Sequence, residues 1–222
     1  MSKVRGYDGE EVRVTFEASR CIHAARCVRR LPAVFDTARR PWIDPNGAPA
    51  EAIEAAVRRC PTGALKSERL DGSMEEEPDT VNDLAVAPNG PIFARGDIEL
   101  VDAERRLITR DTRAAFCRCG ASANKPWCDG SHVDTGFVAP AELGEGRLKP
   151  VPDDPTGPLV VRLRPGGPLV LDGPFRIRAS GSDDVDEGGG CALCRCGASK
   201  NKPYCDGTHN SIGFTAVDPV AS

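Results

Sequence analysis

Two short stretches of the chain carry side chains suited to binding a metal. Residues 117–132 and 194–209 differ at only three positions, which identifies a tandem repeat. Each copy contains three cysteines and one histidine, a complete four-donor set for a soft metal centre. The candidate ligands are Cys117, Cys119, Cys128 and His132 in the first copy, and Cys194, Cys196, Cys205 and His209 in the second.

A third group of cysteines lies near the N-terminus. Cys21, Cys27 and Cys60 form this group, and His23 lies between the first two. All three histidines of the chain therefore fall inside cysteine groups, which favours metal binding over scattered core positions. Cys191 is left over; we expect a core or loop cysteine, with a spare ligand or a reactive thiol as the alternatives.

The elements that must position the N-terminal cysteines alternate in type. Residues 12–16 alternate and are β-branched, as in a strand, and an Ala/Arg-rich segment ending near Pro32 predicts a short helix. A second strand is predicted over 40–43 and a helix over 50–59, which Cys60 and Pro61 end. The predicted fold class is α+β, with a βαβα module at the N-terminus.

A β-rich region follows an acidic segment that is typical of a linker. Short apolar runs recur in the same order before each repeated stretch, and abundant glycine and proline favour short strands and tight loops. The predicted domains are residues 1–70, a linker over 71–87, and repeats over 88–140 and 157–218.

Composition limits the classes of function and the compartment. The net charge of −4 gives no support for nucleic-acid binding, and no apolar run suggests a secretion signal or a membrane span. We therefore expect a cytoplasmic protein with no membrane association. Thiols stay reduced in that compartment, so clustered cysteines are expected to bind metal or do redox chemistry.

The repeated stretch resembles the CDGSH iron–sulfur, or NEET, family. The family pattern is Cys-x-Cys-x2-Ser/Thr-x3-Pro-x-Cys-Asp-Gly-Ser/Ala/Thr-His, and both copies fit it at every defined position. The resemblance implies one [2Fe-2S] cluster per loop, held by the three cysteines and the histidine, and a β-rich tandem unit with pseudo-two-fold symmetry. Asp129 is expected to cap the helix that follows Cys128 and to fix the loop, without being a ligand.

Histidine ligation predicts a particular redox behaviour. A neutral imidazole in place of a thiolate makes the cluster less negative and raises its potential. The outer imidazole nitrogen can still take up a proton, so reduction should be coupled to protonation. Lys125 and Lys202, or Arg118 and Arg195, could tune that proton affinity or be ordinary surface cations.

The N-terminal group resembles a ferredoxin-like module with a single cluster. Bacterial ferredoxin loops run Cys-x2-Cys-x2-Cys with a distant Cys-Pro, and Ala24 stands where the middle cysteine would be. The resemblance implies a [3Fe-4S] cluster on Cys21, Cys27 and Cys60, or a labile [4Fe-4S] whose fourth iron takes His23, water or another ligand. The alternative is that the three are buried structural cysteines.

Two hypotheses for function follow, and the sequence does not separate them. The first is electron transfer or redox sensing, and the second is transfer of clusters or handling of iron; the partner would be a redox protein or a cluster acceptor. A structural zinc protein fits less well, because zinc sites usually use Cys-x2–4-Cys spacing. No catalytic motif is present, so no enzyme activity is expected. The tandem repeat predicts a monomer, since it makes an internal pseudo-dimer.

Overall fold

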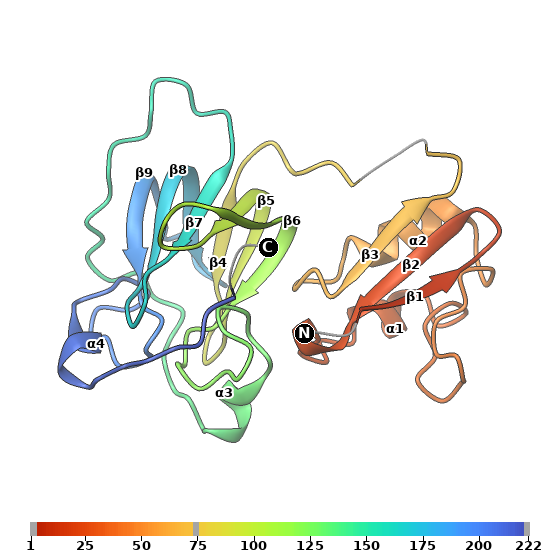
Figure 1. Ribbon diagram of the computed structural model, residues 1–222, viewed down its shortest axis with the longest axis horizontal. Helices are drawn as coiled ribbons and strands as arrows, with labels where there is room; N and C mark the ends of the chain where they lie inside the picture. Colours follow the sequence, from red (N-terminus) through yellow and green to blue (C-terminus); the bar gives the residue numbers. More distant parts are fainter. Residues whose placement is uncertain (1–3, 73–75, 220–222) are drawn as a thin grey trace. The chain divides into compact units, whose positions relative to one another are not determined.

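The chain divides into two compact units. The computed structural model describes residues 4–72 and 76–219. The units are Met1–Glu77 and Pro78–Ser222, and each is described by itself (Figure 1). Within the described residues, no helix is long and apolar enough to span a bilayer.

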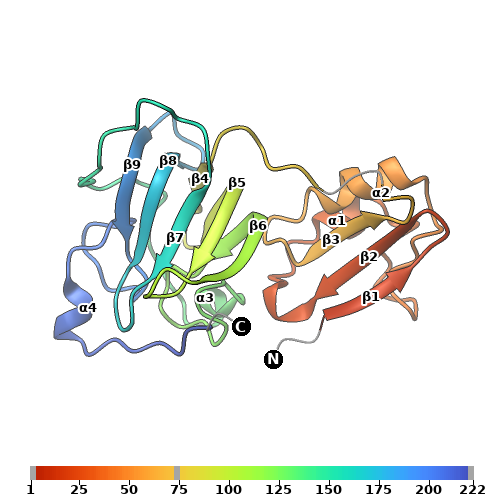
Figure 2. The ribbon, with the colours of Figure 1, turned by 45° about the horizontal axis from the view of Figure 1, so that its top comes forward.

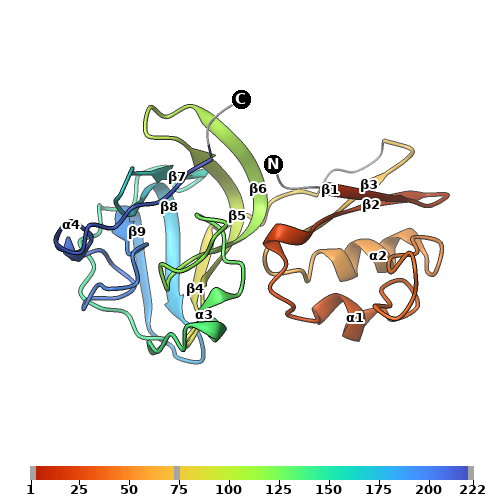
Figure 3. The ribbon, with the colours of Figure 1, turned by 60° about the horizontal axis from the view of Figure 1, so that its bottom comes forward.

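The N-terminal unit is a three-stranded antiparallel sheet with short helices on one face. The strands β1 (Val4–Asp8), β2 (Val12–Glu17) and β3 (Leu65–Arg69) lie in the order β1-β2-β3. The helices are η1 (Ala18–Arg20), α1 (Arg26–Arg30) and α2 (Ala50–Val57), and α1 and α2 lie on the same side of the sheet (Figure 3). Val14 of β2 and Ile53 and Val57 of α2 are fully buried, so the sheet and α2 share one core.

The predicted βαβα order is wrong in its details, because the observed order is β-β-α-α-β. In place of the strand predicted over 40–43, only Ile43 pairs, in an isolated bridge to Phe35. The strands β1 and β3 were not predicted, because their charged, partly exposed residues resemble a solvated segment. Both are edge strands that β2 holds through backbone hydrogen bonds, which needs little apolar side-chain surface.

The second unit contains six strands, three from each repeat. The first repeat supplies β4 (Asp83–Val86), β5 (Ile92–Val101) and β6 (Leu107–Phe116). The second supplies β7 (Leu159–Leu163), β8 (Leu169–Ala179) and β9 (Val185–Leu193) (Figure 2). Because β4 lies inside the range 71–87, the linker ends earlier than predicted; Leu84 and Val86 are fully buried in the core.

The two repeats exchange strands in a symmetric way. Within each repeat the three strands pair antiparallel in sequence order. Between repeats, β4 pairs parallel with β8, and its counterpart β7 pairs parallel with β5. These pairings close β4, β5, β7 and β8 into a small barrel. Each repeat forms one half of it, and corresponding strands of the two repeats pair in the same way.

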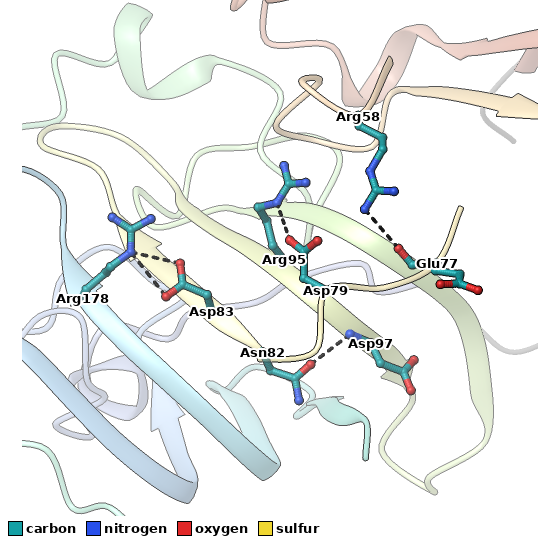
Figure 4. A network of polar contacts seen from close by, with 8 residues as sticks. All are labelled: Arg58, Glu77, Asp79, Asn82, Asp83, Arg95, Asp97 and Arg178. Atoms are coloured by element: carbon teal, nitrogen blue, oxygen red, sulfur yellow. Dashed lines mark hydrogen bonds and ion pairs between the residues drawn. The ribbon is translucent and has the colours of Figure 1, made fainter. Parts of the chain in front are cut away.

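A bend in each long strand makes this exchange possible. In β5 the bend is at Gly96, where φ is 130° and the register with β6 shifts; in β8 it is at Gly173, where φ is 107°. A side chain at Gly96 would place its Cβ 2.3 Å from Asn82 Oδ1. Asn82 itself donates to the carbonyl oxygens of Gly157 (3.0 Å) and Pro174 (2.9 Å) and accepts from the backbone N–H of Asp97 (2.9 Å; Figure 4). This one side chain therefore joins the two repeats.

Two short helices follow the barrel strands. They are α3 (Ser131–Asp134) and α4 (Thr208–Ser211), one in each repeated stretch. Both follow the last cysteine of their loop closely, so they carry the histidines of the candidate sites.

Candidate metal centres

The barrel presents each repeated loop in the same way. Cys117 directly follows β6, and Cys194 directly follows β9. The loop then returns to its own strand: the backbone N–H of Cys128 donates to Ala115 O (2.8 Å), and that of Cys205 donates to Ala192 O (2.8 Å). The cysteines of each loop are therefore fixed to a strand end that is buried in the barrel core.

The donor atoms of each loop stand in two pairs. In the first repeat, Cys117 Sγ lies 3.7 Å from Cys119 Sγ, and Cys128 Sγ lies 3.4 Å from His132 Nδ1. In the second repeat, the separations are 3.8 Å between Cys194 Sγ and Cys196 Sγ and 3.4 Å between Cys205 Sγ and His209 Nδ1. In both loops the Nδ1 atom of the histidine faces the cysteine sulfur.

These separations fit two tetrahedral metal ions per loop. Bonds of about 2.3 Å to sulfur and about 2.0 Å to nitrogen place two sulfurs about 3.8 Å apart and a sulfur and a nitrogen about 3.5 Å apart. Each pair therefore has the spacing of two ligands on one ion. Within the part of the chain that the structure describes, no three such side chains converge on a point that could hold a single ion. The pairs suit a binuclear centre, and the donor set of three sulfurs and one nitrogen suits iron and sulfide.

The two pairs of a loop also interact electrostatically. A hydrogen bond from the Cys117 thiol, aided by the backbone N–H of Ala121 and the charge of His132, lowers the pKa of Cys119 to about 6. Burial raises the pKa of Cys128 to about 11, and the negative charge of Cys119 adds to that rise. In the second repeat, burial raises the pKa of Cys194 to about 11. Bound cations would stabilise all these thiolates, so metal binding should release protons.

Asp129 and Asp206 brace the loops through backbone hydrogen bonds. Asp129 accepts hydrogen bonds from the backbone N–H groups of Ala123 (2.8 Å) and Ser131 (3.0 Å). Backbone N–H groups of Thr208 and Lys200 hold the pKa of Asp206 well below its usual range. The N-cap residue of α3 is Gly130, one position after the predicted Asp129, although the Asp129 carboxylate still accepts the N–H of the first helical residue, Ser131. The predicted role of Asp129 in fixing the loop agrees with these hydrogen bonds.

The arginine between the first two cysteines is structural in both loops. Arg118 and Arg195 are only 1% exposed, so the description of them as surface cations is wrong. Arg118 donates to four backbone carbonyl oxygens, those of Ala87, Gly90, Ala139 and Pro140. Arg195 donates to two carbonyl oxygens and forms an ion pair with Asp218 (2.5 Å). Each guanidinium therefore ties its loop to the segments around it.

The two loops touch each other at their glycines. A Cβ built on Gly120 would lie 2.3 Å from Cys196 O, and one built on Gly197 would lie 2.1 Å from Cys119 O. Both glycines have positive φ, 79° and 80°. Each loop thus packs its glycine against a ligand residue of the other loop. This contact was not predicted from the sequence. The glycine is present in both copies, but its packing against a cysteine of the other loop depends on the exchange of strands between the repeats.

The three N-terminal cysteines line a common cavity. Cys21, Cys27 and Cys60 surround a cavity of about 30 Å³, together with Ala24. His23 is not among the described residues that line this cavity, and its role as an extra ligand stays a prediction. Both His23 and Ala25 have positive φ, 54° and 55°, which bends the loop tightly around the cavity.

Two of the cysteines of this cavity, Cys21 and Cys27, are partly buried, and Cys60 acts on both. Burial raises the pKa of Cys21 and Cys27, and the charge of Cys60 raises both further. The backbone N–H groups of His23 and Val28 point at these sulfurs and act in the opposite direction. Such N–H donors are typical of sites that hold thiolate-bound clusters. The three cysteines and these N–H donors match the donor set of a cluster with three protein thiolates.

Cys191 is a residue of the barrel core. It is buried in the barrel core on β9, opposite Leu171 of β8. Burial raises its pKa to about 12, so its thiol stays protonated near neutral pH. Its place is that of a core residue.

Comparisons with known proteins agree with these three sites. The family described as "Iron-binding zinc finger CDGSH type" matches residues 89–133 and 166–210. The family described as "Divergent 4Fe-4S mono-cluster" matches residues 7–69. No solved structure matches the chain.

Two bacterial relatives match a shorter part of the chain. "Uncharacterized protein YjdI" from Escherichia coli (strain K12) is 37% identical over 62 residues, which are 28% of this chain and 82% of that protein. The protein of the same name from Escherichia coli O157:H7 matches with the same identity and coverage. The chain therefore carries two CDGSH-type stretches in tandem, after an N-terminal region that matches the divergent 4Fe-4S mono-cluster family.

Proposed function

We propose that this protein carries electrons or senses redox state through three iron–sulfur clusters. Two would be [2Fe-2S] clusters, one in each repeated loop, and the third a [3Fe-4S] cluster in the N-terminal unit. The proposal assigns no catalytic residue. A redox protein would be its partner, in the cytoplasm, and the chain would be a monomer.

The observation that carries the proposal is the two-by-two grouping of donors in both loops. Cys117 and Cys119 would hold one iron of the first cluster, and Cys128 and His132 the other; Cys194 and Cys196, and Cys205 and His209, would do the same in the second repeat. The bound cluster would supply an iron pair that accepts one electron. His132 and His209 would bind through Nδ1, which leaves Nε2 to exchange a proton.

The nature of the third cluster depends on its fourth corner. Cys21, Cys27 and Cys60 offer three thiolates, and Ala24 lines the cavity where a fourth could stand. Three thiolates suit a [3Fe-4S] cluster. The matching family is described by a four-iron cluster, so a labile [4Fe-4S] whose fourth iron binds water is the alternative. An EPR signal in the oxidised protein would support the three-iron form. A silent oxidised protein with about eight irons per chain, four from the two loops and four from this cluster, would support the four-iron form.

Cluster transfer is a second candidate function, favoured by the position of the histidines. His132 and His209 are half-buried on one-turn helices that carry no other ligand, whereas Cys117 and Cys194 are fully buried. An iron bound by the histidine would lie on the exposed side of the loop, so it could leave while the barrel strands stay paired. Protonation of the histidine would then release the cluster to an acceptor.

One experiment separates the two functions. The iron-loaded protein is mixed with an apo-ferredoxin in two samples, one with the protein oxidised and one with it reduced. Each sample is then taken through several cycles of reduction and reoxidation. Reversible cycling with full retention of iron supports electron transfer. Rapid appearance of the cluster on the acceptor supports cluster transfer. Separately, size-exclusion chromatography with light scattering measures the molar mass and tests whether the chain is a monomer.

A further inference from the structure

A second, larger cavity lies beside the cysteine loop of the N-terminal unit. Its volume is about 720 Å³, within the range of small-molecule sites. Cys21 and Cys27 border it, whereas Cys60 and Ala24 line only the small cavity described above. The large cavity is thus a space next to the proposed cluster, on the outer side of the loop.

Three aromatic side chains form one wall of this cavity. They are Tyr7 of β1, Phe16 of β2 and Trp42. The Phe16 and Trp42 rings are 4.9 Å apart at 80°, and the Tyr7 and Trp42 rings are 6.5 Å apart at 79°. Trp42 also packs against the fully buried Phe35, which holds it in place. Such a wall offers flat apolar surface against which a planar ring can pack.

The rim of the cavity is positively charged. Arg5 and Arg40 border it, and both are exposed. Arg5 pairs with Phe16 in the β1–β2 register, so its side chain lies on the same face of the sheet as the Phe16 ring. Arg40 is held by hydrogen bonds to Thr37 O (2.8 Å) and Arg39 O (2.7 Å). Among the described residues that line the cavity, none is a carboxylate.

From this combination we propose that the cavity binds a small organic anion with a planar aromatic body. The body would pack against Trp42 and Phe16, and the anionic group would lie at the rim between Arg5 and Arg40. A guanidinium matches the planar geometry of a carboxylate or phosphate, which gives the site its preference for an anion. The bound molecule would lie against Cys21 and Cys27, at the edge of the proposed cluster. The site does not depend on which cluster these cysteines hold.

The proposal is tested by equilibrium dialysis of the iron-loaded full chain with two matched probes. 2-Naphthoate has the aromatic body and the anionic group, and 2-naphthalenemethanol has the body alone. We expect one molecule of 2-naphthoate to bind per chain, and the alcohol to bind roughly tenfold more weakly, because it lacks the charged contact. Arg5→Gln and Arg40→Gln should each weaken naphthoate binding several-fold and leave binding of the alcohol unchanged.

Arg13→Gln is the matched control, because Arg13 is an exposed arginine on β2 that pairs with Asp8 (3.3 Å) and does not line the cavity. Iron content, measured for every variant, shows that the unit has folded. Three results would overturn the proposal. They are equal binding of the two probes, equal affinity of the Arg5, Arg40 and Arg13 variants for naphthoate, and no saturable binding of naphthoate up to about 1 mM. Displacement of naphthoate by hexaglutamate more readily than by benzoate would also overturn it, in favour of an acidic protein segment.

Discussion

The contact between the two cluster loops predicts that a mutation in one repeat damages the cluster of the other. Gly120→Ala would place a methyl group 2.3 Å from Cys196 O and 2.6 Å from its carbonyl carbon. Ordinary contacts between carbon and oxygen are about 3.3–3.6 Å, so the two loops must separate by about 1 Å. Cys196 is a proposed ligand of the second cluster, and its displacement should therefore weaken that cluster.

The size of the effect follows from two separate costs. Forcing a methyl group into a packed contact costs about 1–3 kcal/mol, which corresponds to roughly a fivefold to hundredfold change in an equilibrium or a rate. The positive φ of 79° at Gly120 adds strain within the first loop. Gly130→Ala separates these costs, because Gly130 has a φ of 96° and a Cβ there would meet nothing within 4 Å. This control carries the strain without the collision.

The assay needs a way to observe each cluster alone. His132→Cys gives the first cluster an all-thiolate set and a lower potential, so EPR at controlled potential counts the two clusters separately. In this background, Gly120→Ala should speed acid loss of the second cluster at least about fivefold relative to Gly130→Ala. Equal rates of loss for the two alanine variants would refute the idea that Gly120 positions Cys196.

Three further predictions concern single sites. His132→Cys should lower the potential of the first cluster and remove the fall of that potential with rising pH, both measured by redox titration; an unchanged potential would show that His132 is not a ligand. In the metal-free protein, the pKa of Cys119 is lowered to about 6. Cys119 is therefore mostly a thiolate above that pH and mostly a protonated thiol below it. Alkylation mapped by mass spectrometry should therefore modify Cys119 faster than Cys128 at pH 7 and slow as the pH falls through about 6, whereas a rate that rises only above about pH 8.5 would contradict this. Gly96→Ala should lower the free energy of unfolding by about 2–4 kcal/mol, measured by denaturant titration. The added methyl group would lie 2.3 Å from Asn82 Oδ1, and a φ of 130° is unfavourable for alanine. An unchanged unfolding midpoint would show that the bend tolerates a side chain.

The candidate ligands could be predicted from the sequence because their spacing is local. Within one loop, the order Cys-x-Cys followed by Cys-x3-His is enough to bring the donors together, and the structure groups them in pairs. The β-rich character of the second unit also followed from short apolar runs. Edge strands such as β3 were missed, because their pairing depends on backbone hydrogen bonds that leave no apolar pattern.

Features that join distant segments could not be predicted from the sequence. The exchange of β4 and β7 between repeats depends on parallel pairings across the barrel. Arg118 has no sequence signal that distinguishes a buried scaffold from a surface cation, and its carbonyl partners come from segments 21 to 31 residues away. The meeting of Gly120 with Cys196 follows from the same symmetric packing.

The central claim is that each repeated loop holds a two-iron cluster, and metal analysis tests it most directly. The measurement is iron, acid-labile sulfide and zinc per chain in anaerobically prepared protein in which Cys21, Cys27 and Cys60 are replaced by serine, so that only the two loops can bind metal. The account predicts four irons and four sulfides per chain, an EPR-silent oxidised state and a signal on reduction. One zinc per loop with no sulfide would contradict it.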